Sequence, residues 1–344
     1  MPDRLSLAGP LKATTPPVEV RIVPLGRLWP ALGGVLMPVL LAARYSERHA
    51  LGLLTGAGSL GMLFPPCLPL ILYAIVANTS AQANLSLKEI FLGGIGPGLL
   101  LVAITAWWGI RKGSREAADR PAFRWAEARA ALWDAKWELS IPVVAVGSLF
   151  TVPTIVEAAA VTATTALVIA MVIHREVHPI RDLPRVITQC GLLVGGVLLI
   201  LGVALGFTHY LVDAQLPDKL VAWATTAVKS KWLFLLGLNL VLLFVGGLVE
   251  IYAAIIVVVP LLVPLGVAFG IDPIHLGIIF LANMELGFLC PPVGLNLLLS
   301  SYRFNRPMAE VIRAAFPMLL VLLLGVLLIT YFPPLTTFLP RLFR

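Results

Sequence analysis

Two stretches of the sequence repeat one pattern whose chemistry would be the binding of a cation by backbone oxygens. Each has a glycine, three residues and a double proline inside a long apolar run, with Gly61 before Pro65-Pro66 and Gly287 before Pro291-Pro292. Proline leaves a backbone carbonyl without its helical donor, and glycine lets the backbone approach an ion closely. A lone instance would be a kinked helix with a packing glycine. Two copies favour broken helices, whose freed carbonyls and helix ends can hold sodium or face an anion.

Polar side chains flank the second copy of this pattern in otherwise apolar sequence. Asn283 and Glu285 precede it, Asn296 follows it, and Glu250 stands three residues after the pair Gly246-Gly247. An ionisable residue at membrane depth is by default a functional hypothesis. We expect these groups to converge on one region if a turn at Gly246-Gly247 meets the second break. The alternative for Glu250 is a neutral, hydrogen-bonded helix cap.

An intramembrane enzyme is a second interpretation, with Glu250, Glu285 or His275 as the acid or base. It would need a nucleophile or a metal-ligand cluster at helical spacing, and the sequence shows neither. His275 stands alone beside Pro273 at a helix start, where capping or solvation is expected. We therefore predict that the protein is not an enzyme.

The cysteines give no framework for metal binding or redox chemistry. Cys67, Cys190 and Cys290 all lie in apolar segments, and no two form a CxxC pair. We expect small, buried hydrophobic side chains at all three positions.

The composition requires that these residues be positioned by membrane helices. Of 344 residues, 59% are hydrophobic and only 12% are charged, and the mean hydropathy is +0.95. Soluble domains carry about 25% charged residues, whereas about 20 apolar residues in a row cross a bilayer. The fold class is therefore an all-α polytopic membrane protein. The net charge of +7 is explained by membrane topology rather than by nucleic acid, because Lys and Arg gather on cytoplasmic loops.

The apolar runs predict several spans, two of them broken. The expected elements are a broken helix over residues 50–77, a span over 90–110 that ends in belt residues Trp107 and Trp108, two short passes within 139–173, a span over 189–210, a re-entrant hairpin over 232–270, a second broken helix over 274–300 and a last span over 315–335. In residues 111–138, Arg and Lys alternate with Trp, which predicts an amphipathic helix on the membrane surface. Glu157 is expected to be a buried carboxylate with a structural role.

Charge placement orients these elements. We assign residues 44–48, 111–136, 175–185 and 303–306 to the cytoplasm because they are basic. The two broken helices then cross the bilayer in opposite directions, as in an inverted-topology repeat. The expected domains are a first repeat over residues 30–110, a cytoplasmic connector over 111–138 and a second repeat over 139–344.

Three segments resemble a known family. They are ALGGVLMPVLLAARYSERHALGLLTGAGSLGMLFPPCLPLILY, the EAAAV run at Glu157, and GIDPIHLGIIFLANMELGFLCPPVGLNL. From about residue 30 to its end the chain resembles the large, DctM-type permease subunit of tripartite ATP-independent periplasmic (TRAP) transporters. The resemblance implies an elevator-type, inverted-repeat ion-transporter fold in the bacterial inner membrane. It also implies sodium-coupled uptake of an organic acid, such as a C4-dicarboxylate or sialic acid.

The resemblance further implies partners and site residues. The partners would be a small, DctQ-type membrane subunit and a soluble, DctP-type periplasmic binding protein, with sodium as the coupling ion and no other cofactor. The implied sodium ligands are Gly246, Gly247, Gly287 and Cys290 at one site, and Gly58, Ser59 and Gly61 at the other. The implied substrate-binding residues lie near the hairpin tips and are Pro66, Glu250, Pro292 and Asn296.

The sequence departs from the family pattern at three places. Cys290 stands where the family usually has threonine, which removes a hydroxyl ligand but keeps the carbonyl. Thr154-Ile155-Val156-Glu157 replaces a Thr-Pro-Thr-Glu run, so a role for that run is in doubt. The family's first spans and first hairpin, with a Ser-Gly-Ser tip, should precede Ala31, yet residues 1–29 are proline-rich and atypical. We expect that segment to be poorly ordered and the transporter to be N-terminally truncated. The alternative function is then a non-transporting remnant.

Overall fold

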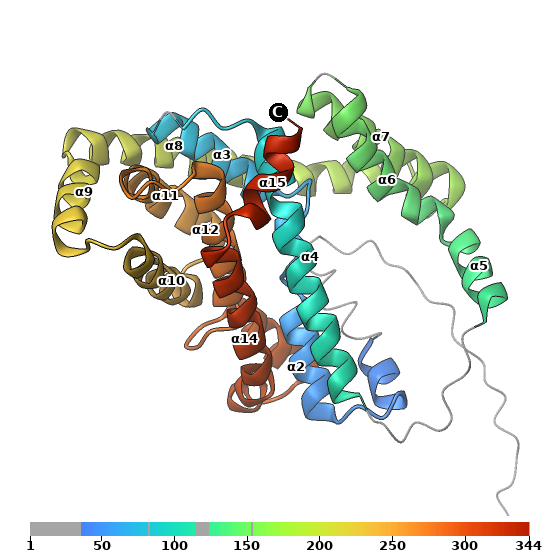
Figure 1. Cartoon of the computed structure of the whole chain (residues 1–344). Helices are drawn as coiled ribbons and strands as arrows, with labels where there is room; N and C mark the ends of the chain where they lie inside the picture. The colour runs from blue at the N-terminus through green and yellow to red at the C-terminus, as the bar shows by residue number, and fades with distance from the viewer. Residues whose placement is uncertain (1–35, 82, 114–123, 153, 344) are drawn as a thin grey trace, which may run out of the picture.

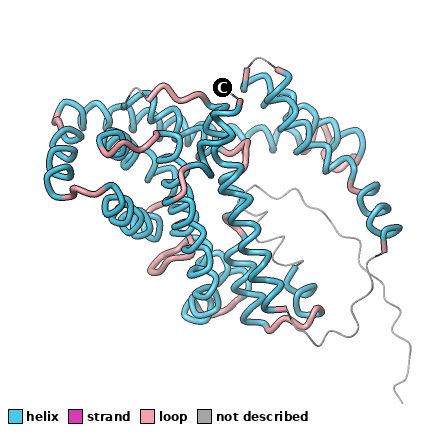
Figure 2. The backbone as a smooth tube through the Cα atoms, in the orientation of Figure 1, coloured by secondary structure: helices cyan, strands magenta, loops and turns pink. Residues whose placement is uncertain are grey.

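The computed structural model describes residues 36–81, 83–113, 124–152 and 154–343, and these residues form helices and loops without any strand (Figure 2). The expectations for residues 1–29 lie outside the described residues. In chain order the helices are α2 (Glu47–Ala57), the 3₁₀ turn η1 (Leu60–Leu63), α3 (Leu68–Ala81), α4 (Leu87–Lys112), α5 (Trp125–Asp134), α6 (Lys136–Thr151), α7 (Ile155–Val168), the π-helical η2 (Ile169–Ile173), α8 (Leu183–Asp213), α9 (Leu216–Ala227), α10 (Lys231–Leu248), α11 (Ile251–Ala268), α12 (Pro273–Gly287), α13 (Leu295–Phe304), α14 (Met308–Tyr331) and α15 (Pro334–Leu342).

The helices confirm a multi-pass membrane protein. Within the described residues, 5 helices are long and apolar enough to cross a bilayer: α4, the helix over residues 156–173, α10, α11 and α14. The bent pair formed by residues 47–63 and 68–79 would be a sixth, with an angle of 46° between its halves. The span predicted over residues 189–210 lies inside α8, which is 31 residues long.

Helix α12 forms the centre of the core. Every residue from Ile274 to Gly287 is buried, as expected of a helix that is apolar on all sides. Its neighbours include α10, α14 and α4, which surround it in Figure 1. The helix that leads to the second break is therefore held by packing on all sides.

Both predicted breaks are present. The first helix stops at Ala57 and resumes at Leu68, and the second stops at Gly287 and resumes at Leu295. The Pro65-Pro66 and Pro291-Pro292 peptide bonds are both cis. Proline cannot donate a backbone N–H, so each helix ends before the double proline.

The two broken helices run antiparallel, as predicted. The Arg306 guanidinium pairs with Glu47, so the end of the second broken helix meets the start of the first. At the other end, the Tyr73 hydroxyl donates to the Pro273 carbonyl at 3.0 Å, so α3 meets the start of α12.

Several basic segments meet at one end of the molecule. Arg48 Nη2 donates to the Arg313 carbonyl at 3.1 Å, and the Tyr45 hydroxyl donates to the Gly109 carbonyl at 3.0 Å. The starts of α2 and α14 and the end of α4 are thereby joined. One expectation near this end was wrong: Trp107 is 52% exposed, but Trp108 is only 5% exposed and packs edge-on against His49 rather than facing a lipid interface.

The segment predicted as a hairpin forms helices α10 and α11, with only Val249 and Glu250 between them. We had expected Gly246 and Gly247 to form the connection between the two helices. They lie instead within the C-terminal end of α10. Glu250 caps α11 through a hydrogen bond from Tyr252 N at 2.9 Å. The cap satisfies a backbone donor at the helix start, and this places the turn after the glycines.

The predicted connector over residues 111–138 is not a single helix. Arg111 and Lys112 end α4, residues 114–123 lie outside the described part of the chain, and α6 already begins at Lys136. Helix α5 between them has no buried residue. Lys136 Nζ lies 4.3 Å from the Trp133 ring centroid, so a cation and an apolar ring do share this exposed segment. Its position on the membrane surface stays a prediction.

Two passes were expected within residues 139–173, where helices α6 and α7 pack on each other beside the main body (Figure 1). The helix over residues 156–173 is long and apolar enough to cross a bilayer, whereas a pass formed by α6 stays a prediction. Glu157 is exposed rather than buried, because it forms a capping box with Thr154 at the start of α7. The capping box supports the expected structural role, which stays a prediction. Cys190, in α8, is exposed rather than buried.

Candidate ion and substrate site

The end of α10 touches the second break backbone to backbone. A Cβ atom placed on Gly287 would lie 2.5 Å from both Cα and C of Gly246. A Cβ on Gly246 would lie 3.1 Å from Gly287 Cα and 3.2 Å from Met284 Cα. Real Cβ atoms are not found as close as 2.5 Å to backbone atoms, so position 287 requires glycine, and a side chain at position 246 would fit only if the backbone of α12 shifted by a few tenths of an ångström. The sequence predicted this pairing of Gly246 with Gly287.

The next turn of the contact brings two further predicted residues together. A Cβ on Gly247 would lie 3.3 Å from the Cys290 carbonyl oxygen. Gly294 N donates to the Gly247 carbonyl at 3.2 Å. The four residues expected at one sodium site, Gly246, Gly247, Gly287 and Cys290, therefore form one contiguous patch of backbone.

Gly294 is a residue that the sequence interpretation missed. Its φ is +37°, and an added Cβ would lie 2.8 Å from the Cys290 carbonyl oxygen and 2.9 Å from the Phe288 carbonyl oxygen. Only glycine fits a backbone of this kind. The signal was available in the second copy, where Gly294 follows the double proline and precedes a new helix. The first copy has Leu68 at the corresponding place, so the two breaks are not equal.

The first break lies against α12. Ser59, which is 3% exposed, donates from Oγ to the Glu285 carbonyl at 3.4 Å. Cys67 Sγ donates to the Met62 carbonyl at 2.6 Å, which closes the loop on itself. Gly61 is exposed and has open space where a Cβ would stand. Ser59 and Gly61 thus lie on the buried and open sides of the same short turn.

The residues expected to bind substrate do not share one environment. Pro66, Glu250 and Pro292 are exposed at the breaks and the α10–α11 turn. Asn296 is buried, and its Nδ2 donates to the Thr55 carbonyl at 3.3 Å. Asn296 therefore connects α13 to α2. Thr55 Oγ1 adds a second link, to Ser300 Oγ at 2.9 Å. The link between Thr55 and Ser300 was not predicted from the sequence, although small hydroxyl residues commonly join membrane helices.

The expected convergence of polar side chains was wrong. The turn meets the break, but Glu250 faces outward and Asn283 faces α10, where its Nδ2 donates to Asn239 Oδ1 at 2.7 Å. Thr330 Oγ1 donates to the same Asn239 oxygen at 3.0 Å. Asn239, a single amide inside an apolar helix, was the signal for this three-helix link. Helix rotation, which the sequence does not report, sets these directions.

His275 is neither a cap nor a solvated residue. It is 1% exposed, with Nδ1 2.8 Å from Thr336 Oγ1 and Nε2 3.2 Å from the Thr330 carbonyl oxygen. The cap of α12 is Asp272, which accepts from Ile274 N at 2.9 Å. His275 therefore joins α12 to α14 and α15.

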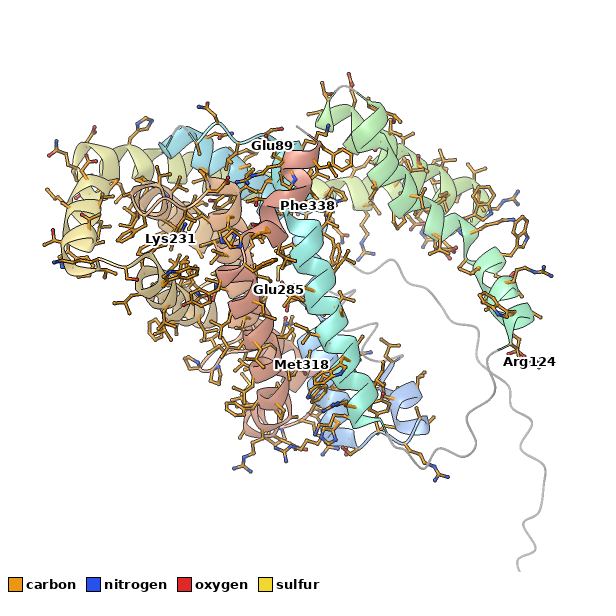
Figure 3. The ribbon with its side chains drawn as sticks, viewed as in Figure 1. Glu89, Arg124, Lys231, Glu285, Met318 and Phe338 are labelled. Atoms are coloured by element: carbon orange, nitrogen blue, oxygen red, sulfur yellow. The ribbon has the colours of Figure 1, made fainter. Side chains whose placement is uncertain are left out.

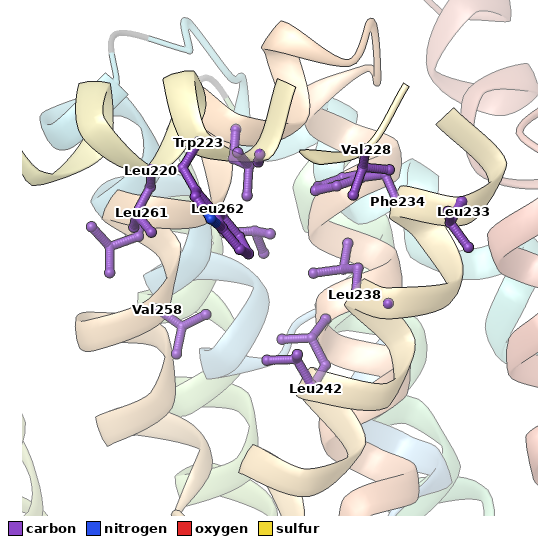
Figure 4. A pocket seen from close by; sticks show the side chains of 14 residues that line it. Leu220, Trp223, Val228, Leu233, Phe234, Leu238, Leu242, Val258, Leu261 and Leu262 are labelled. Atoms are coloured by element: carbon purple, nitrogen blue, oxygen red, sulfur yellow. The ribbon is translucent and has the colours of Figure 1, made fainter. Parts of the chain in front are cut away.

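Acidic and metal-ligating side chains do not cluster in the described part of the chain, where no group of three His, Cys, Asp or Glu residues could hold a metal ion. An apolar pocket of about 300 Å³ lies between α9, α10 and α11 (Figure 4). Its lining includes Trp223, Phe234 and Leu262, which offer no ligand for an ion. Among the described residues, the candidate ion ligands that we consider are the backbone at the two breaks and the buried carboxylate of Glu285.

Comparison with known proteins identifies the family. The family model described as "Tripartite ATP-independent periplasmic transporter, DctM component" matches residues 30–335. The C4-dicarboxylate TRAP transporter large permease protein DctM of Pseudomonas aeruginosa is 34% identical over 90% of this chain and 72% of its own length. The sialic acid TRAP transporter large permease protein SiaM of Vibrio cholerae is 31% identical over 91% and 72%. The isethionate TRAP transporter permease protein DctMQ of Oleidesulfovibrio alaskensis is 32% identical over 88% and 47%.

Proposed function

Because the chain belongs to the DctM family of TRAP transporter large permease subunits, we propose that it takes up an organic acid together with sodium ions. It is a multi-pass protein of the bacterial inner membrane, and its family is one of transporter permeases rather than enzymes. Relatives carry the names of C4-dicarboxylate, sialic acid and isethionate transporters, so the substrate varies within the family. A C4-dicarboxylate or another carboxylate is the substrate class that we propose for this chain.

The contact between Gly246 and Gly287 carries the proposal. A break in a membrane helix leaves backbone groups unsatisfied, at a cost of several kcal/mol each, unless the gap holds a ligand or lines a cavity. Here a second helix end approaches the break so closely that only glycine fits. This geometry supports one sodium site at Gly246, Gly247, Gly287 and Cys290. The second site would use Gly58, Ser59 and Gly61.

Substrate would meet the exposed side of the same region. Pro66, Glu250 and Pro292 are exposed there, and we propose that they face the transported acid. Asn296 would act differently from our expectation, because its hydrogen bond to Thr55 joins the two broken helices. It would position the breaks rather than touch the substrate.

The antiparallel breaks support the proposed inverted repeat, with residues 30–110 and 139–344 as its halves and 111–138 as connector. In an elevator-type cycle, the breaks and the α10–α11 pair would move together through the membrane. The family implies a small, DctQ-type subunit and a DctP-type binding protein as partners. The name of the DctMQ relative joins the two membrane subunit names, which supports the small subunit as a direct neighbour.

Uptake into proteoliposomes tests this function. The chain is reconstituted with the small subunit and the binding protein of its own system, and radiolabelled succinate and sialic acid serve as probes. We expect accumulation under an inward sodium gradient and none under an equal potassium gradient. Gly287→Val should abolish it, because the side chain would push α10 away from the break. Gly147→Val is the matched control, since a Cβ there meets nothing within 4 Å. Equal uptake in sodium and potassium, or full uptake by Gly287→Val, would contradict the proposal.

A further inference from the structure

Glu285 lies at the centre of the molecule (Figure 3) without a partner for its side chain. The residue is 2% exposed, and neither carboxylate oxygen has a hydrogen-bond partner among the described residues. A buried charge that lacks a partner is far more costly than a buried, hydrogen-bonded polar group. Protonation alone would not satisfy the group, because the carboxyl O–H would also lack an acceptor there. The described part of the chain therefore offers this side chain no hydrogen-bond partner in either state.

The surroundings of Glu285 place it against the first break. Side chains two positions apart on a helix point to different sides, and Asn283 faces Asn239 on α10. Glu285 therefore points away from α10. Ser59 Oγ donates to its backbone carbonyl at 3.4 Å, and the turn η1 of the first break packs on α12. A carboxylate from the second broken helix is thus buried beside the break in the first.

We infer that Glu285 is the anionic ligand of the coupling cation at the first break, beside the neutral oxygens of Ser59 and the freed backbone carbonyls. The inference rests on the proposed function, which puts a sodium ion at that break. Hard cations prefer oxygen ligands. In a poorly polarisable interior, a full negative charge attracts a cation more strongly than carbonyl dipoles do. A monovalent cation would therefore satisfy the carboxylate and the broken backbone together.

The inference makes the two breaks unequal. Glu285 stands two residues before the second break, but its side chain points away from α10, and the other acidic residue near that contact, Glu250, has an exposed carboxylate that caps α11. The first break would therefore hold its ion with a charge, and the second with backbone carbonyls alone. Removal of the Glu285 charge should weaken one sodium-binding event and leave the other intact.

Sodium-dependent thermal stability of the purified full chain tests the inference without measuring transport. Melting temperature is recorded by tryptophan fluorescence while NaCl replaces choline chloride at constant ionic strength, because a bound ion stabilises the folded state by mass action. Glu285→Gln keeps the shape of the side chain and removes its charge. We expect this variant to need at least tenfold more sodium than the wild type for the same rise in melting temperature. Glu127→Gln is the control, because Glu127 is exposed and pairs only with Arg124 on the surface of the described chain.

The outcomes separate the inference from the function on which it rests. A wild-type protein that sodium does not stabilise would overturn the proposed sodium coupling. Stabilisation of the wild type with an unchanged sodium midpoint in Glu285→Gln would overturn only the role of Glu285. If Glu285→Gln does not fold, Glu285→Asp replaces it, since the shorter side chain withdraws the charge from the break. An unshifted midpoint in Glu285→Asp would equally reject the inference, and a raised midpoint would support it.

Discussion

The absence of side chains at Gly246 and Gly287 lets the backbones of α10 and α12 come into direct contact. The two backbones meet so closely that a methyl group on either must displace the other. Overpacking of this kind costs about 1–3 kcal/mol. Elsewhere in a helix, alanine in place of glycine is favourable by up to about 1 kcal/mol. The same substitution should therefore have opposite effects at two positions of α10.

Gly246→Ala should lower the melting temperature, whereas Gly237→Ala on the same helix should leave it unchanged or raise it. A Cβ at Gly237 meets nothing within 4 Å, so only the helix propensity changes there. Thermal denaturation of both variants in one detergent is the measurement. Equal melting temperatures for Gly246→Ala and the wild type would show that α10 does not press on the second break.

At the residue scale, the sequence predicted backbone contacts better than side-chain directions. Gly287 and Cys290 were identified because glycine and proline restrict the backbone in ways that a pattern reveals, and the family resemblance implied their grouping with Gly246. Asn283 and His275 were misplaced, because a polar residue in an apolar run does not reveal which neighbour it faces. For Glu250 the helix-cap alternative is confirmed. Gly294 could have been found from its place between a double proline and a helix.

At the scale of helices, buried amides and hydroxyls link elements that apolar packing alone would leave free to slide. Asn239 Oδ1 accepts from Asn283 Nδ2 and Thr330 Oγ1, which ties α10 to α12 and α14. Hydrogen bonds between membrane helices are worth about 0.6 kcal/mol on average, and up to about 1.7 kcal/mol. The link therefore adds modest stability but fixes the rotation of α10 against α12.

Asn239→Leu should destabilise the protein by roughly 1 kcal/mol, because two donors lose a shared acceptor. Thr330→Val should cost less in the Asn239→Leu background than alone, since both substitutions break the same contact. A double-mutant cycle of unfolding free energies in detergent measures this coupling. Strictly additive effects of the two substitutions would mean that Asn239 and Thr330 do not share a hydrogen bond.

Element boundaries followed from the sequence where proline sets them, and differed from the prediction at the α10–α11 turn and in the connector. The breaks at the double prolines were predicted because proline ends a helix by its own geometry. The α10–α11 turn came three residues later than expected, at Val249-Glu250, because Glu250 caps α11. The connector was predicted as one helix, but Lys136 already belongs to α6, and composition alone did not reveal that boundary.

Across the whole molecule, the antiparallel pairing of the two broken helices is the feature that relates the distant halves of the chain. Thr55 in α2 and Ser300 in α13 are 245 residues apart in sequence, yet their hydroxyl oxygens lie 2.9 Å apart. The sequence predicted this arrangement from the placement of basic loops. It did not predict which side chains would meet, because register depends on the depth of each helix in the core.

In a background without native cysteines, Thr55→Cys with Ser300→Cys should form a disulfide under mild oxidation, because the two side chains are in contact. A protease site is introduced within residues 114–123, which lie between the two cysteines in sequence. After cleavage, a cross-linked chain migrates as one species on a denaturing, non-reducing gel, whereas a chain without the cross-link separates into two fragments. Thr55→Cys with Ser148→Cys is the control, since Ser148 belongs to α6 and bonds within the α6–α7 pair. Cross-linking of the control pair alone would refute the antiparallel arrangement.

Coupled flux of sodium and substrate tests the central claim, that the two breaks bind the ions which drive uptake. In proteoliposomes containing the complete system, the influx of radioactive sodium is measured with and without the transported acid, and the influx of the acid with and without sodium. We predict that each flux stimulates the other in wild-type protein and that Gly287→Val loses both stimulations. Uptake of the acid that proceeds at full rate without any sodium influx would contradict the account.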